Sequence, residues 1–177
     1  MEFLTLVKER RSIRAYKGDN TISESTLKEI ISTTLQAPTW KNSETGRYYI
    51  AANKESMDAV RAALPAFNQN STANASAFIV TAYEKNISGF TKGEADNELG
   101  NQWGAYDLGL QTSYLLLRAK ELGLDSLIMG LRDAAKLRKS FNIPETQEIV
   151  SVIALGYRDG DALLRKRKEV EEVATFL

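Results

Sequence analysis

The sequence contains no cysteine and no histidine among its 177 residues. Without cysteine, the chain can form no disulfide bond, no thiolate nucleophile and no cysteine-ligated iron–sulfur or zinc site. Without histidine, it has no Ser-His-Asp triad, no imidazole proton shuttle and no histidine ligand for a metal ion. If the protein is an enzyme, its chemistry must therefore come from carboxylates, lysines or tyrosines, or from a bound cofactor.

Excess charge and long apolar runs are missing as well. The chain has 23 Lys+Arg and 23 Asp+Glu, so its formal net charge is zero, whereas a dedicated nucleic-acid binder is usually strongly basic. No apolar stretch approaches the roughly 20 residues that cross a bilayer. The opening MEFLTLVKERRS has no long apolar core followed by a cleavage site, as a signal peptide would. We therefore expect a cytoplasmic protein that binds neither nucleic acid nor membrane.

The length fits a single domain, since domains usually contain about 100–200 residues. No proline-rich, glycine/serine-rich or repeated segment marks a linker, so residues 1–177 are expected to form one unit. The tail 161–177 is charged and then apolar at Phe176 and Leu177. It is therefore expected to be a C-terminal arm.

Apolar periodicity predicts alternating helices and strands. Helical spacing predicts helices over 2–10, from the N-cap Ser23 to about 36, and over 54–64, 101–122 and 133–140. Short β-branched and aromatic runs predict strands over 47–52, 77–83, 125–130 and 148–158. The polar stretch 84–100 is expected to be a surface loop or lid. This alternation indicates an α/β or α+β layer fold, and the helix 101–122, apolar nearly all round, should lie centrally or in an interface.

Two basic clusters lie near opposite ends of the chain. Arg10-Arg11-Ser12-Ile13-Arg14 follows the first predicted helix, and Arg165-Lys166-Arg167-Lys168 lies in the tail. Guanidinium groups suit a phosphate or a carboxylate. Each cluster can also be a solvated run of charge, and arginine is favourable at a helix C-terminus for its own sake.

Three further segments are candidates for ligand binding. The loop APTWKNSE at 37–44 presents polar side chains after a Pro-led turn, and Asn68-Gln69-Asn70-Ser71 form an Asn-rich cap or turn. Gly130, after DSLIM, permits close approach of the backbone to a ligand. Each of the three can also be an ordinary connection.

Together these motifs resemble the nitroreductase family of FMN-dependent oxidoreductases over nearly the whole chain. The points of resemblance are RRSIR at 10–14, APTWKN at 37–42, FNQNSTANAS at 67–76, LRAKELGLDSLIMG at 117–130, NIPE at 142–145 and IALGYRDGDALLRKRKEVEEV at 153–173. No GxGxxG dinucleotide fingerprint is present. The resemblance implies an α+β fold, with a mostly antiparallel sheet flanked by helices, built as an intertwined homodimer. Two flavins would sit at the dimer interface, each contacted by both chains.

The resemblance also implies a cofactor, FMN, and its binding residues. The motif residues Arg10, Arg11, Ser12 and Arg14 would contact the phosphate and the ribityl chain or ring edge, and the bases Arg165 and Arg167 would complete the phosphate clamp. Asn42 and Glu44 would lie by the flavin, Asn68 at its pyrimidine side, and the backbone of Met129 and Gly130 at its N5. No metal ion is implied.

The implied reaction is ping-pong hydride transfer from NADH or NADPH, through flavin N5, to a flat electron-poor acceptor such as a nitroaromatic or quinone. Alternatives are a non-catalytic flavin-binding or sensor protein, and divergent flavin chemistry such as dehalogenation or flavin fragmentation. Two positions depart from the family pattern. Glu44 replaces an amide, and Ser71 stands where some relatives carry a lysine near flavin N1, for which Lys41 is a weak substitute.

Overall fold

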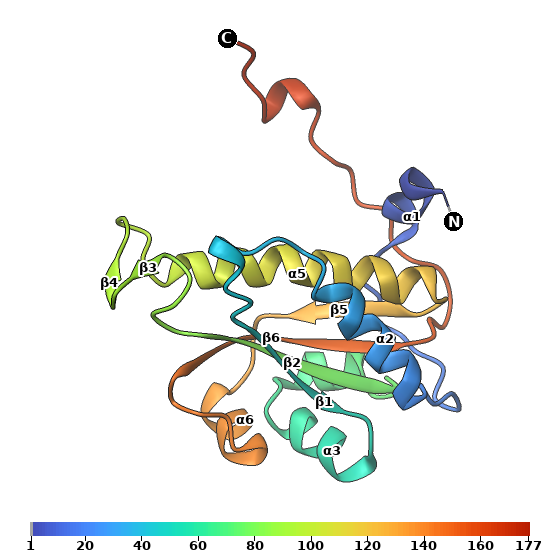
Figure 1. Cartoon of the computed structure of the whole chain (residues 1–177). Coiled ribbons are helices and arrows are strands. Elements are labelled where there is room, and N and C mark those ends of the chain that lie inside the picture. Colours follow the sequence, from blue (N-terminus) through green and yellow to red (C-terminus); the bar gives the residue numbers. More distant parts are fainter. Residues whose placement is uncertain (1) are drawn as a thin grey trace.

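The computed structural model describes residues 2–177 and places a four-stranded antiparallel sheet between two layers of helices (Figure 1). The strands lie in the order β1-β2-β6-β5. Their bounds are β1 (Gly46–Ala51), β2 (Ala77–Glu84), β5 (Asp125–Met129) and β6 (Gln147–Gly156). All three pairings are antiparallel. The predicted α+β class with an antiparallel sheet is therefore confirmed.

Helices cover both faces of this sheet. α2 and α5 lie on one face, and α3 and α6 lie on the other (Figure 1). The helices are α1 (Phe3–Glu9), α2 (Glu24–Thr34), α3 (Lys54–Ala62), α4 (Ala66–Ser71), α5 (Gln102–Glu121) and α6 (Ala134–Phe141). No helix of residues 2–177 is both long and apolar enough to cross a membrane.

The central strands are apolar on both sides because each face of the sheet supports its own core. In β2, Phe78 and Val80 pack with α3 and α6, while Ala77 and Ile79 pack with α2 and α5. All four side chains are completely buried. Two-sided burial explains why the sequence shows a continuous apolar run here rather than strict alternation.

Local capping chemistry sets several element ends where the sequence predicts them. The Oγ of Ser23 accepts from the Thr26 N–H at 3.1 Å and begins α2. Gly123 has φ of 81° directly after α5, a left-handed conformation that suits glycine at a helix C-terminus.

The structure corrects the sequence-based assignment in one place and adds detail in two others. Residues 66–71 form α4 rather than a turn. The sequence of this short helix has no apolar residues at helical spacing, so periodicity does not predict it. Its buried residue Asn68 faces the core. The predicted lid 84–100 contains a small hairpin of β3 (Phe90–Thr91) and β4 (Glu94–Ala95). The arm 161–177 leaves the body beside α1 and carries a single 3-10 turn, η2 (Val170–Glu172) (Figure 1).

Candidate functional site

The arginine-rich segment after α1 is fixed at the edge of the sheet beside β5. Arg10 caps α1, and its N–H donates to a carbonyl one turn back at 3.0 Å. The N–H of Ile13 donates to the Ser126 carbonyl at 2.9 Å, and a parallel bridge joins Ser12 to Ser126. Ile13 is buried, so its neighbours Ser12 and Arg14 lie on the exposed side of this extended segment.

Three guanidinium groups gather at this segment. The pKa of Arg10 is lowered, first by burial and then by the positive charges of Arg167 and Arg11. Arg167, near the far end of the sequence, therefore lies close to Arg10 in the fold. Among the described residues 2–177, these three arginines and Arg165 form no ion pair with a carboxylate. Such uncompensated cations are suited to binding a phosphate.

A small cavity of about 180 Å³ lies between this segment and the beginning of the arm. It is lined by Ser12, Ile13, Arg14 and Ala15 on one side and by 159–163 on the other. The Asp159 N–H donates to the Ala15 carbonyl at 2.9 Å, which joins the two segments. The arm is thereby anchored next to the residues that carry the first basic cluster.

A second group of predicted site residues meets at the other end of β5. The buried Asn68 donates from Nδ2 to the carbonyl of Leu131 at 3.4 Å. Leu131 follows Gly130, at which an added Cβ would have no neighbour within 4 Å. The side chain of Met129 is buried in the core, so only its backbone can face a ligand.

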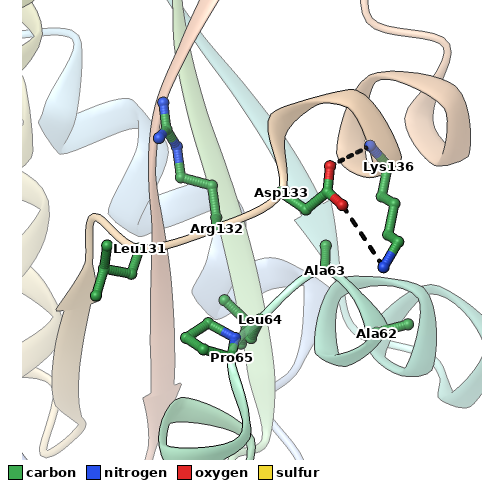
Figure 2. A pocket seen from close by; sticks show the side chains of 8 residues that line it. All are labelled: Ala62, Ala63, Leu64, Pro65, Leu131, Arg132, Asp133 and Lys136. Atoms are coloured by element: carbon green, nitrogen blue, oxygen red, sulfur yellow. Dashed lines mark hydrogen bonds and ion pairs between the residues drawn. The ribbon is translucent and has the colours of Figure 1, made fainter.

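A cavity of about 340 Å³ adjoins this turn (Figure 2). It lies between the end of α3 and the turn that leads into α6, which are joined by the Asp133 N–H donating to the Ala63 carbonyl at 2.7 Å. Its lining residues are Ala62, Ala63, Leu64, Pro65, Leu131, Arg132, Asp133 and Lys136.

The two groups are spaced for an elongated ligand. Ser12 is bridged to Ser126, at the beginning of β5, whereas Gly130 follows its end. Four residues of extended strand span about 13 Å. A ligand with an anionic end and a hydrogen-bonding ring can therefore lie along β5.

Asn42 and Glu44 lie elsewhere in the chain fold. They immediately precede β1, which is the strand at the opposite edge of the sheet from β5. Three strand spacings amount to about 14 Å. One chain therefore brings together Arg10, Arg11 and Arg167, and separately Asn68 and Gly130, but leaves Asn42 and Glu44 apart from both groups.

The loop that carries Asn42 and Glu44 is held in an unusual backbone conformation. Lys41, Asn42 and Glu44 have φ of 48°, 53° and 48°, which non-glycine residues rarely adopt and which often marks functional loops. Asn42 Nδ2 donates to Glu44 Oε1 at 3.3 Å, and the Glu44 N–H donates to Thr39 Oγ1 at 3.1 Å. The Trp40 N–H donates to Asp107 Oδ2 on α5 at 2.9 Å. The Glu44 carboxylate is thus presented next to the Asn42 amide.

Comparisons with known proteins identify the family of this chain. Residues 7–157 match the family model described as "Nitroreductase family". The chain belongs to the nitroreductase family. A protein from Archaeoglobus fulgidus, provisionally named NADH dehydrogenase/NAD(P)H nitroreductase, is 29% identical over 160 residues, covering 88% of this chain and 85% of the relative.

Solved structures show the nitroreductase-like fold. A provisional NAD(P)H:FMN oxidoreductase from Staphylococcus epidermidis superposes with a TM-score of 0.85 at 19% identity, covering 99% of this chain and 96% of that one. CLA-ER, an enone reductase of gut-bacterial fatty acid saturation, gives a TM-score of 0.88 at 19% identity, covering 99% and 98%. At these identities the likeness concerns the fold alone.

Sequence reasoning missed two residues of this nitroreductase-family chain that the fold places beside the candidate site. Asp107 is a buried acid on α5 that anchors the 37–44 loop, and its only signal was an acidic side chain within a largely apolar predicted helix. Arg132 donates from Nη1 to the Gly130 carbonyl at 3.2 Å, and nothing in the sequence distinguished it from an ordinary loop residue. Lys41 is bound to the lid at Asp96 and Thr91.

The donor set fits FMN. Clustered guanidinium groups without counterions suit its phosphate, and the amide of Asn68 suits the polar edge of its ring. The open space at Gly130 permits a ring to approach the backbone closely, because no side chain fills it.

Proposed function

We propose that this chain is an FMN-dependent oxidoreductase that takes hydride from NADH or NADPH and gives it to a flat electron-poor acceptor, such as a nitroaromatic or quinone, in a ping-pong cycle. Membership of the nitroreductase family supports the general oxidoreductase role. The observation that carries FMN is that the fold joins the two basic segments. Residues 12–15 and 159–163 line one cavity, the Asp159 N–H donates to the Ala15 carbonyl, and the Arg167 charge acts on Arg10.

The residues of this chain bind and orient the cofactor. Arg10, Arg11 and Arg167 would hold the phosphate, with Ser12 and Arg14 on the exposed side of the same segment and Arg165 on the arm. Asn68 would donate to or accept from the pyrimidine edge. When bound, FMN would supply the redox chemistry, as an acceptor and donor of hydride. No titrating catalytic residue is needed for this role.

We further propose that the working enzyme is a homodimer. Asn42 and Glu44 lie about 14 Å across the sheet from the Gly130 edge, so a second copy is needed to bring this loop to the flavin. The unpartnered apolar surface of α1 and α5 supports such an assembly, since Phe3, Leu4, Tyr106 and Tyr114 are 64%, 65%, 60% and 41% exposed. The exposed arm 161–177 would wrap the partner.

The decisive experiment is anaerobic mixing of the purified protein and FMN with NADH or NADPH. We expect the absorbance of oxidised flavin to disappear near neutral pH and to return when a quinone or nitroaromatic is added. Flavin that binds without being reduced would favour the flavin-binding or sensor alternative. Absence of FMN binding would overturn the proposal.

A further inference from the structure

One edge of β6 lacks a strand partner along part of its length. β5 pairs with β6 only between Met129↔Val152 and Asp125↔Gly156, whereas β6 begins at Gln147. Arginine side chains supply hydrogen bonds to the carbonyls beyond the end of β5. Arg132 Nη2 donates to the Ile149 carbonyl, and Arg138 Nη2 donates to the Gln147 carbonyl at 2.8 Å. Both side chains thus satisfy backbone groups at a strand edge.

These two arginines differ in how their charge is balanced. Arg138 forms an ion pair with Glu145, with Nε and Oε1 3.4 Å apart. Arg132 forms no ion pair among the residues that the structure describes. Its Nε is also buried without a hydrogen-bond partner. Carbonyl oxygens solvate the Arg132 guanidinium but do not neutralise it, so its positive charge acts on its surroundings.

That charge stands beside the turn that the proposed function assigns to the flavin ring. Arg132 Nη1 donates to the Gly130 carbonyl at 3.2 Å, and Asn68 Nδ2 donates to the carbonyl of the intervening Leu131 at 3.4 Å. Figure 2 shows the guanidinium directed away from the adjoining cavity, while Leu131 lies on the other side of the turn. The side chain therefore fastens the turn to β6 and fixes the charge next to it.

The other candidate bases do not lie at this turn. Ser71 is uncharged, and its hydroxyl donates to the Phe67 carbonyl within α4 at 2.8 Å. Lys41 is paired with Asp96 at 3.1 Å in the lid, which lies with the 37–44 loop at the far edge of the sheet. Within the described residues, Arg132 is thus the arginine bonded directly to the Gly130 turn.

We propose that Arg132 is a positioning residue with an electrostatic role. It holds the Gly130–Leu131 turn against β6, and its unneutralised charge stabilises the negative charge that FMN gains on reduction. This inference rests on the proposed function. A fixed cation stabilises a negative charge that develops nearby, and a flavin ring lying on the turn would shield this interaction from water.

The test compares the affinity of the protein for oxidised and for reduced FMN, measured anaerobically by fluorescence or absorbance titration. The variants are Arg132→Gln, which removes the charge, and Arg132→Lys, which keeps it. Arg138→Gln is the matched control, because it loses the same kind of carbonyl hydrogen bond while its charge is already balanced by Glu145. The ratio of the two dissociation constants gives the change in reduction potential by linkage.

We expect Arg132→Gln to weaken binding of reduced FMN relative to oxidised FMN by about tenfold or more. The ratio should stay within about twofold of wild type in Arg132→Lys and in Arg138→Gln. An unchanged ratio in Arg132→Gln would overturn the inference, as would an equal fall in Arg138→Gln. If Arg132→Gln does not fold, a tenfold fall in Arg132→Lys contradicts the role of the charge. Failure of the wild-type protein to bind FMN would instead refute the proposed function.

Discussion

The backbone N–H of Trp40 donates to the buried carboxylate of Asp107 at 2.9 Å, across 67 residues of sequence. The hydroxyl of Ser88 donates to the same Oδ2, and Ser43 Oγ lies 2.9 Å from Ser88 Oγ. One acid on α5 therefore joins the 37–44 loop to the lid 84–100. Trp40 packs against Trp103 in a tilted arrangement, with ring centroids 4.6 Å apart and an interplanar angle of 47°, and this contact adds to the junction.

Replacing Asp107 by alanine is expected to lower the free energy of unfolding by about 2–3 kcal/mol, because the Trp40 N–H and the Ser88 hydroxyl lose the acceptor that they share. Asp107→Asn, which keeps an acceptor oxygen, should lose less. Urea unfolding followed by circular dichroism measures both. The exposed Asp58→Ala on α3 serves as control, and equal losses in all three would contradict the anchoring role.

Removing either side of the basic cluster should weaken FMN binding. We expect Arg10→Ala and Arg167→Ala each to raise the dissociation constant about tenfold, since each loses a charge-assisted hydrogen bond to the phosphate. The loss of binding free energy in the double variant should be smaller than the sum of the two single losses, because both residues act on one phosphate. Fluorescence titration at two salt concentrations measures this. Lys54→Ala, on the far side of the sheet, should bind FMN normally, and normal binding in both arginine variants would place the phosphate elsewhere.

A charge on the exposed α1–α5 surface should separate the subunits. Phe3, Leu6, Tyr114 and Leu117 line an apolar cavity of about 370 Å³ there. We expect Tyr114→Lys to be monomeric in size-exclusion chromatography with light scattering, and to lose FMN with the partner. Ile50→Lys, on the edge strand β1, should remain dimeric. A Tyr114→Lys monomer that keeps full FMN affinity would show that one chain completes the site.

Buried tyrosines should make the protein sensitive to alkali. The pKa of Tyr16 is raised by burial and then by the Asp125 carboxylate, and burial also raises the pKa of Tyr48. Because these tyrosines keep their protons more firmly in the folded state, their contribution to stability is fully present below the unfolded-state pKa of about 10. This contribution is lost as the pH rises towards and through the folded-state pKa. Unfolding free energies measured between pH 8 and 11.5 should therefore fall above about pH 10. Tyr16→Phe should flatten that fall, and an unchanged slope would contradict the assignment.

Much of the secondary structure could be predicted from the sequence because the ends of the elements depend on interactions between neighbouring residues. The side chain of Ser23 caps α2 and Gly123 follows α5, as their sequence positions predict. α4 was missed because a six-residue helix of polar residues has no apolar period. It forms because Asn68 and Gln69 bond to carbonyls outside it, at Leu131 and Leu64. Such contacts involve partners whose proximity exists only after folding.

The sequence by itself determined which functional groups are available, namely no thiol, no imidazole and two basic clusters. It also determined the match of residues 7–157 to the nitroreductase family. Only the tertiary structure decided how these groups are combined. It brings Arg167 close to Arg10, although nothing in the sequence around either residue distinguishes it from an ordinary surface arginine. It leaves Asn42 on the opposite edge of the sheet, and it gives Arg132 and Arg138 different electrostatic roles at one strand. The strength of a charge interaction depends on the distance between the charges and on the dielectric constant around them, and both are set only when the chain folds.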